Sequence, residues 1–208
     1  MRSRVMERAS LAATHDFDEL SIHSDIEVRF VRQFELRMLA EMANRLVPGV
    51  QITAPILSKY VTFDPECIFT FIRRNKLVGA VAFLYLNRRG HDALILDELS
   101  LNQPDLGLLA KSDEAVSAIY IWAVAATGRG IAGYGKVVSH LRTARYVNAN
   151  CFAQPSTKAG RDWLIRARFQ PIPSFQRDLW CYQRPWNRLP PTTQLPNVSA
   201  RSIVNAWH

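Results

Sequence analysis

A glycine-rich run in the second half of the chain is the part of the sequence best suited to bind a charged ligand. Residues 127–135 (TGRGIAGYG) contain four glycines and follow a long uncharged stretch. Glycine lets backbone N–H groups approach a ligand closely, and the first turn of a helix adds N–H donors without a backbone partner. Because these donors carry a partial positive charge, the run predicts a site for an anion such as a pyrophosphate.

Two familiar phosphate-binding motifs do not fit this run. The G-K-[ST] ending of a P-loop is absent, and no acidic residue follows about twenty positions later, where a dinucleotide-binding fold places its ribose contact. An alternative to an anion site stays open, in which the glycines are needed only for tight packing.

The residues on either side of the glycine run predict a strand before it and a helix after it. Residues 115–126 (AVSAIYIWAVAA) carry no charge and are rich in β-branched and aromatic residues, which indicates a buried strand. Residues 136–145 continue as a helix, and 146–153 form a short strand. A strand–turn–helix–strand unit places two strands roughly parallel, with the helix N-terminus between them.

The other apolar patterns complete a domain of the α+β class with a mixed sheet. Apolar residues between 26 and 47 recur at helical spacing, and the Pro-Gly pair that follows ends that helix. Further elements are a hairpin (67–73 and 77–86), short helices with loop (91–114), a helix (155–168) and a closing strand pair (169–172 and 179–183). We expect the domain over 26–184, a flexible N-terminal tail over 1–25 and a Pro-containing C-terminal tail over 185–208.

Composition and charge limit the class of protein. The chain has 208 residues, of which 48% are hydrophobic and 21% charged, so it can bury one sizeable core. Its net charge of +8 is concentrated between Thr127 and Arg188, where eleven Lys and Arg residues face two acidic ones. The basic segment favours an anionic ligand or partner. The three cysteines are widely spaced, which argues against a disulfide framework and a metal site. No apolar run is long enough to span a membrane. We therefore expect a cytoplasmic protein.

In the order of its elements and in two short motifs, the sequence resembles the GNAT superfamily of acyl-CoA-dependent N-acyltransferases. The superfamily signature is [RQ]-x-x-G-x-[GA], and residues 127–132 (TGRGIA) match its last two fixed positions, with Thr127 where Arg or Gln is usual. Residues 156–172 resemble the last helix of the family and its GF-x-P exit, with Arg168 in place of the glycine. The resemblance covers residues 26–184 and implies a central mixed sheet splayed between its fourth and fifth strands, with flanking helices.

The resemblance also implies how acetyl-CoA, the cosubstrate, would be held. The pantetheine arm would pair with the end of the fourth strand, and the pyrophosphate would lie on the amides of the glycine turn. Lys136 would supply a further cation for the phosphates, and Arg161 is an alternative to Lys158 on the adenosine side. The implied cofactor-binding residues are Trp122, Ala123, Val124, Gly128, Arg129, Gly130, Ile131, Ala132, Gly133 and Lys158. No metal is expected.

Transfer to an amine calls for a base and for a proton donor to the departing thiolate. The predicted strand lacks the Glu that many relatives carry, and Leu164 stands where a Tyr is usual. The candidate bases are the loop acids Asp97, Glu98, Asp113 and Glu114, and the candidate donors are Tyr120 and Tyr134. We select Glu98, Glu114 and Tyr120 as catalytic candidates. Each has a plainer interpretation, a solvated loop acid or a core tyrosine, and Cys151 is interpreted as packing rather than as an acyl carrier.

The function implied is that of an N-acetyltransferase, which transfers an acetyl (acyl) group to a primary amine by direct attack in a ternary complex. A small molecule or a peptide is the expected acceptor, an RNA-linked amine and a homodimer stay open, and no membrane partner is expected. Two alternatives remain at this point. One is a CoA-binding GNAT-like domain without catalysis, and the other is a basic nucleic-acid-binding module, whose binding would weaken steeply with salt.

Overall fold

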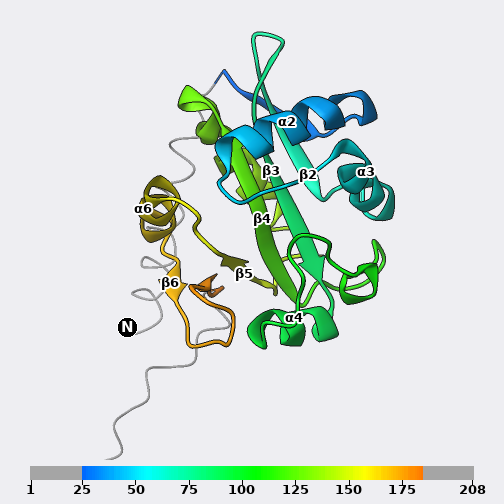
Figure 1. Ribbon diagram of the computed structural model, residues 1–208, viewed down its shortest axis with the longest axis vertical. Helices are drawn as coiled ribbons and strands as arrows, with labels where there is room; N and C mark the ends of the chain where they lie inside the picture. Colours follow the sequence, from blue (N-terminus) through cyan, green and yellow to red (C-terminus); the bar gives the residue numbers. More distant parts are fainter. Residues whose placement is uncertain (1–24, 185–208) are drawn as a thin grey trace, which may run out of the picture.

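One mixed β-sheet organises the part of the chain that the computed structural model describes, residues 25–184 (Figure 1). Within these residues the strands, in their order across the sheet, are β1 (Glu27–Phe30), β2 (Ile68–Arg73), β3 (Lys76–Leu86), β4 (Ala118–Ala126), β5 (Asn150–Ala153), β7 (Trp180–Tyr182) and β6 (Gln170–Pro171). Neighbouring strands are antiparallel except β4 and β5, which are parallel. The predicted mixed α+β sheet is confirmed.

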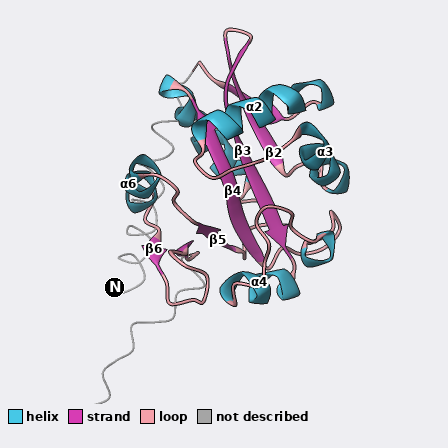
Figure 2. Cartoon of the chain, viewed as in Figure 1, coloured by secondary structure: helices cyan, strands magenta, loops and turns pink. Residues whose placement is uncertain are grey.

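The helices cover both faces of this sheet (Figure 2). They are η1 (Gln33–Glu35), α2 (Leu36–Leu46), α3 (Ala54–Phe63), α4 (Arg88–Ile95), η2 (Leu106–Leu108), η3 (Gly128–Gly133), α5 (Tyr134–His140) and α6 (Lys158–Arg166). Strand alternation shows which helices share a face. Ile68 lines a pocket together with residues of α2 and α3, whereas the next residue, Phe69, packs against His140 of α5. The helices α2 and α3 therefore lie on the face opposite α5.

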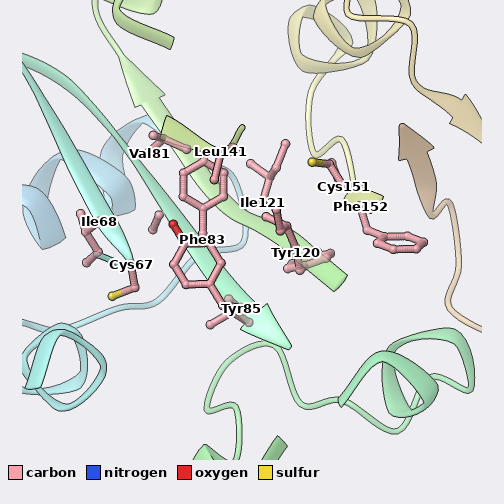
Figure 3. Close-up of a cluster of buried hydrophobic side chains, with 14 of the residues drawn as sticks. Cys67, Ile68, Val81, Phe83, Tyr85, Tyr120, Ile121, Leu141, Cys151 and Phe152 are labelled. Atoms are coloured by element: carbon pink, nitrogen blue, oxygen red, sulfur yellow. The ribbon is translucent and has the colours of Figure 1, made fainter. Parts of the chain in front are cut away.

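The hydrophobic core follows the central strands. Residues 79–86 of β3 and 118–121 of β4 are buried, and Val81 and Ile119 are fully inaccessible to solvent. Figure 3 shows part of this core, in which Tyr120 of β4 lies opposite Phe152 of β5, and Phe83 of β3 lies opposite Ile121 of β4. Among the described residues, none of the helices is both long and apolar enough to cross a membrane.

Several sequence predictions are confirmed. The predicted hairpin is β2 and β3, and the predicted buried strand is β4. The hairpin turn holds Arg74 and Asn75 at φ +49° and +58°, as a tight turn between twisted strands requires. The last helix is α6, which begins after Thr157, whose hydroxyl accepts a hydrogen bond from the Gly160 N–H. The closing pair is β6 with β7.

The predicted helix over 26–47 is wrong in its first part. Residues Glu27–Phe30 form β1, which pairs with β2, and the α-helix begins only at Leu36. Apolar spacing did not reveal this strand, because its pairing partner lies about forty residues away in the sequence.

Two other segments differ from the predictions. The segment between the Pro-Gly pair and the hairpin, for which no helix or strand was predicted, contains α3, whose first turn includes Pro55. The strand predicted at 146–153 begins only at Asn150, because Tyr146 belongs to a turn and uses its hydroxyl in side-chain contacts. The tails predicted at 1–25 and 185–208 lie, apart from Asp25, outside the described residues.

Candidate functional site

The two parallel strands at the centre of the sheet separate halfway along β4. The register pairs Ala118 with Asn150 and ends at the pair Ile121 and Ala153. Beyond that point, residues 122–126 have no strand partner on the β5 side among the described residues, although residues 123–126 still pair with β3. Figure 1 shows β5 leaving β4 at this level. An open strand edge presents N–H and C=O groups that an extended, amide-containing ligand can pair with.

A β-bulge lies where the separation begins. Ala82 is opposite Ala123 and Phe83 is opposite Ile121, so Trp122 is an extra residue without a partner on β3. The Trp122 Nε1–H donates a hydrogen bond to the Leu101 carbonyl at 2.7 Å, and its ring makes a T-shaped contact with Tyr60 at 5.0 Å. These contacts hold the indole against the face that carries α3.

The glycine run after β4 forms a short 3-10 helix that leads into α5. Its beginning is tied to β3, because the Thr127 N–H donates to the Val78 carbonyl at 2.8 Å. The Gly130 N–H donates back to the Thr127 carbonyl at 2.9 Å. Gly128 and Arg129 lie between them at the start of the 3-10 helix, where no earlier carbonyl of the helix can accept their N–H groups. The exposed start of the turn is therefore its best-placed part for an anion.

Packing explains two of the glycines. A Cβ on Gly130 would lie 2.6 Å from the Val78 carbonyl oxygen, and one on Gly133 would lie 2.7 Å from the Phe71 ring. Gly128 differs, since it is exposed, has φ +54°, and a Cβ added to it would meet no atom within 4 Å. Tight packing thus explains Gly130 and Gly133. It does not explain Gly128, which lies at the exposed start of the turn.

The basic segment is divided between structural and solvent-facing residues. Lys136 donates to the Ile26 carbonyl at 2.5 Å, and Arg161 forms a two-pronged contact with Asp178. Arg184 is buried and donates to two backbone carbonyl oxygens. These cations stabilise the fold. The exposed basic residues of the segment include Arg129, Lys158, Arg166, Arg168 and Arg177.

The three catalytic candidates occupy different parts of the fold. Tyr120 is buried in β4, two positions before Trp122, and burial raises its pKa, so it keeps its proton at neutral pH. Glu98 is exposed in the loop after α4. Glu114 is exposed before β4, where its carboxylate accepts the Lys111 N–H at 3.0 Å. Glu114 therefore lies at the end of β4 opposite the glycine turn.

The remaining candidates also have structural surroundings. Tyr134 is buried with its ring at 4.8 Å from the Trp163 ring in a T-shaped contact, and burial raises its pKa. Burial raises the pKa of the Cys151 thiol to about 11, so the reactive thiolate is scarce at neutral pH. Asp97 and Asp113 are exposed loop residues. Within residues 25–184, no group of three or more His, Cys, Asp or Glu side chains is arranged to hold a metal ion.

An apolar pocket of about 60 Å³ lies beside the bulge, on the face covered by α2 and α3. The sequence did not predict it, although alanines at alternate strand positions are its one visible sign. The lining consists of Leu39, Ala43, Val50, Gln51, Ile52, Leu57, Ile68, Ala80, Ala82, Leu101, Asn102, Trp122, Ala123 and Ala125. None of these lining residues is charged.

A cluster of charged and aromatic side chains, which the sequence also did not predict, lies near the other end of β4. Arg145 donates to Asp64 and to the Tyr146 hydroxyl, both at 2.7 Å, and Tyr146 donates to Glu66 at 2.7 Å. His140 Nε2 lies 3.2 Å from the Glu66 carboxylate. The partners are about eighty residues apart in the sequence, so no local pattern could reveal them. The cluster ties the α5–β5 connection to the start of β2.

Comparison with known proteins supports the fold. No family model matches the chain, and no curated protein matches it. Among solved structures, Ard1 from Thermoplasma volcanium is similar with a TM-score of 0.50 and 10% identity, covering 76% of this chain and 95% of that one. A GNAT family acetyltransferase from Brucella melitensis in complex with acetyl-CoA gives a TM-score of 0.46 and 15% identity, with coverage of 76% and 87%. Naa50 from Arabidopsis thaliana, in complex with a bisubstrate analogue, gives 0.47 and 15%, with coverage of 76% and 97%.

The arrangement of the strands agrees with this similarity. Antiparallel strands lead to a parallel β4–β5 pair that separates beside a glycine turn, as the GNAT resemblance implies. At this level of identity the similarity concerns the fold. The chain therefore has the fold of the GNAT superfamily.

Proposed function

We propose that this protein is an acyl-CoA-dependent N-acyltransferase that acylates a primary amine on a small molecule or a peptide. The observation that carries the proposal is the open edge of β4 over residues 122–126, which leads directly into the exposed start of the glycine turn. An edge for an amide chain followed by donors for an anion suits the two chemical parts of coenzyme A, its pantetheine arm and its pyrophosphate.

In this proposal the chain holds CoA mainly through its backbone. The pantetheine amides pair with Trp122, Ala123 and Val124, beyond the point where β5 leaves. The pyrophosphate lies at the start of the turn, with the N–H groups of Gly128 and Arg129 as its donors, since the Gly130 N–H already donates to the Thr127 carbonyl. The exposed cations Arg129 and Lys158 add attraction for the phosphates.

The reaction proposed is a direct transfer. Acetyl-CoA supplies its acyl group as a thioester; the amine nitrogen forms the new bond to the carbonyl carbon, the carbon–sulfur bond breaks, and the sulfur takes up a proton. The bulge at Trp122 supports polarisation of the thioester oxygen by strand N–H groups, because it leaves β4 backbone groups unpaired. Tyr120 is the proposed proton donor because it is the tyrosine of β4, two positions before Trp122. Glu98 is the proposed base, acting through water; Glu114, at the far end of β4, is the weaker candidate.

Ligand binding tests this proposal first. A ligand present at about 100 times its dissociation constant stabilises a protein by roughly 2.7 kcal/mol, which a thermal shift detects. We expect shifts with CoA and acetyl-CoA but not with inorganic phosphate. Arg129→Glu should weaken CoA binding, whereas Arg88→Glu, the same charge change at the opposite end of the sheet, should leave it unaltered.

Turnover then separates the remaining functions. Release of free thiol from acetyl-CoA with a panel of amines is the expected result. CoA binding without turnover would favour a GNAT-like domain that lacks catalysis. Absence of any CoA shift, together with RNA binding that weakens steeply as salt rises, would refute the proposal in favour of a nucleic-acid-binding module.

A further inference from the structure

The apolar pocket beside Trp122 borders the part of β4 proposed to hold the pantetheine arm. Trp122 and Ala123 belong both to the open strand segment and to the pocket lining. Any group joined to the thioester end of CoA would therefore have an apolar recess next to it, between β4 and the helix α2.

Small side chains create this recess. Its floor is made by Ala80 and Ala82 of β3 and by Ala123 and Ala125 of β4, while Ala43 of α2 lies above them. Elsewhere the same strands fill the core with large residues such as Phe83 and Leu84. Because the pocket is partly open, its apolar lining stays in contact with water, which is unfavourable compared with burial. A run of alanines beside a functional edge is thus best explained by a ligand group that fills the space.

The chemistry of the lining limits what that group is. No charged side chain lines the pocket, and its two amide residues, Gln51 and Asn102, are exposed. The Trp122 indole N–H is already donated to Leu101. A carboxylate or an ammonium placed there would be buried without a partner, at a large cost in free energy. The pocket fits an uncharged aliphatic group.

Its size limits the length of that group. One water molecule needs roughly 10–15 Å³, so a pocket of about 60 Å³ holds roughly four to six groups of that size. An acetyl group, with a single methyl, would leave most of this space empty.

We propose that the pocket binds the acyl group of an acyl-CoA, and that this group is an uncharged, short aliphatic chain longer than acetyl. This inference rests on the proposed function, and it names the acyl donor that the same site prefers. The prediction needs no knowledge of the acceptor, because donor binding is measurable without one.

Calorimetry with CoA, acetyl-CoA, butyryl-CoA and succinyl-CoA tests the proposal. Each buried methylene contributes about 0.8 kcal/mol, so butyryl-CoA should bind roughly tenfold more tightly than acetyl-CoA. Succinyl-CoA has an acyl chain of the same carbon number but carries a carboxylate, and it should show no such gain.

Filling the pocket provides the matched variants. Ala43→Leu adds side-chain volume from α2 with a good helix former. It should leave CoA and acetyl-CoA binding unchanged while it removes the advantage of butyryl-CoA. Ala82→Val adds side-chain volume to the pocket from β3, and it replaces Ala43→Leu in the experiment if that variant does not fold. Ala144→Leu, at an exposed position of the α5–β5 connection, is the control and should keep the butyryl-CoA preference.

The outcomes separate the pocket from the proposed function. If CoA and acetyl-CoA bind but butyryl-CoA gains nothing, the acyl-chain assignment is wrong while the proposed function stands. If instead an aliphatic amine raises acetyl-CoA affinity and Ala43→Leu cancels that effect, the pocket takes part of the acceptor, which also overturns the assignment. If no CoA compound binds, both proposals fail.

Discussion

The guanidinium of Arg145 donates a hydrogen bond of 2.7 Å to the carboxylate of Asp64, although 81 positions separate the two residues. Both side chains are largely buried, at 16% and 5% exposure. The contact joins the segment before β2 to the connection between α5 and β5. It thereby helps to hold both the helix that follows the glycine turn and the strand that leaves β4.

Removing this carboxylate should destabilise the fold. Asp64→Asn leaves the Arg145 guanidinium buried without its closest anion, and breaking a buried pair in this way costs about 3 kcal/mol or more. Urea unfolding measures the loss. Glu41→Gln, which breaks the exposed Arg37–Glu41 pair of α2, is the control and should cost about 0.5 kcal/mol or less. Equal unfolding midpoints for Asp64→Asn and the wild type would contradict the role given to the pair.

Glu35 should make stability depend on pH in the acidic range. Its carboxylate accepts two hydrogen bonds from Arg29 and one from the Arg32 N–H, and the Arg29 contact holds its pKa below the usual value of 4.5. The folded state therefore binds the proton less readily than the unfolded state. The resulting stabilisation is complete above the unfolded-state pKa and is lost as the pH falls through the lower folded-state pKa.

Unfolding curves of the wild type and Glu35→Gln test this dependence. At neutral pH the variant should be less stable by about 2 kcal/mol, because it loses hydrogen bonds to a charged group. The difference should shrink as the pH falls below about 4.5. A difference that stays constant from about pH 7 to about pH 3 would show that the charge of Glu35 is not the cause.

Alanine should be tolerated differently at two glycines of the same turn. Gly130→Ala places a Cβ against the Val78 carbonyl at 2.6 Å, so the backbone must shift, at a cost of about 2 kcal/mol. Gly128→Ala meets no atom within 4 Å and has only the cost of its positive φ, about 1 kcal/mol.

Thermal unfolding of the two variants, with and without CoA, separates packing from ligand binding. A substitution at Gly130 lowers the stability of the fold, so its effect on CoA binding is hard to separate from unfolding. A substitution of the exposed Arg129 tests the anion site more directly. If Gly130→Ala were as stable as the wild type, the close approach of the turn to β3 would be in doubt.

Cys151 should not act as an acyl carrier. Burial raises its pKa to about 11, so alkylation by iodoacetamide at neutral pH should be slow in the folded protein and fast once it is unfolded. Cys151→Ala should retain the proposed acyl transfer, since direct attack by an amine needs no covalent enzyme intermediate. A complete loss of turnover in a folded, CoA-binding Cys151→Ala variant would argue for a thioester on the enzyme.

Local patterns in the sequence determined the central part of this protein. The uncharged run that became β4, the glycine turn after it and the hairpin before it were predictable, because each depends on neighbouring residues alone. The same residues supported the GNAT resemblance, and with it the separation of β4 from β5.

Tertiary structure decided what depends on residues far apart in the chain. Whether residues 27–30 extend a helix or form β1 is settled by pairing with β2. The packing role of Gly130 depends on the position of Val78, which no local pattern gives. The alanine-floored pocket exists only where two strands and two helices meet. Such features arise from contacts whose free energy belongs to the assembled fold, and no short stretch of sequence carries them.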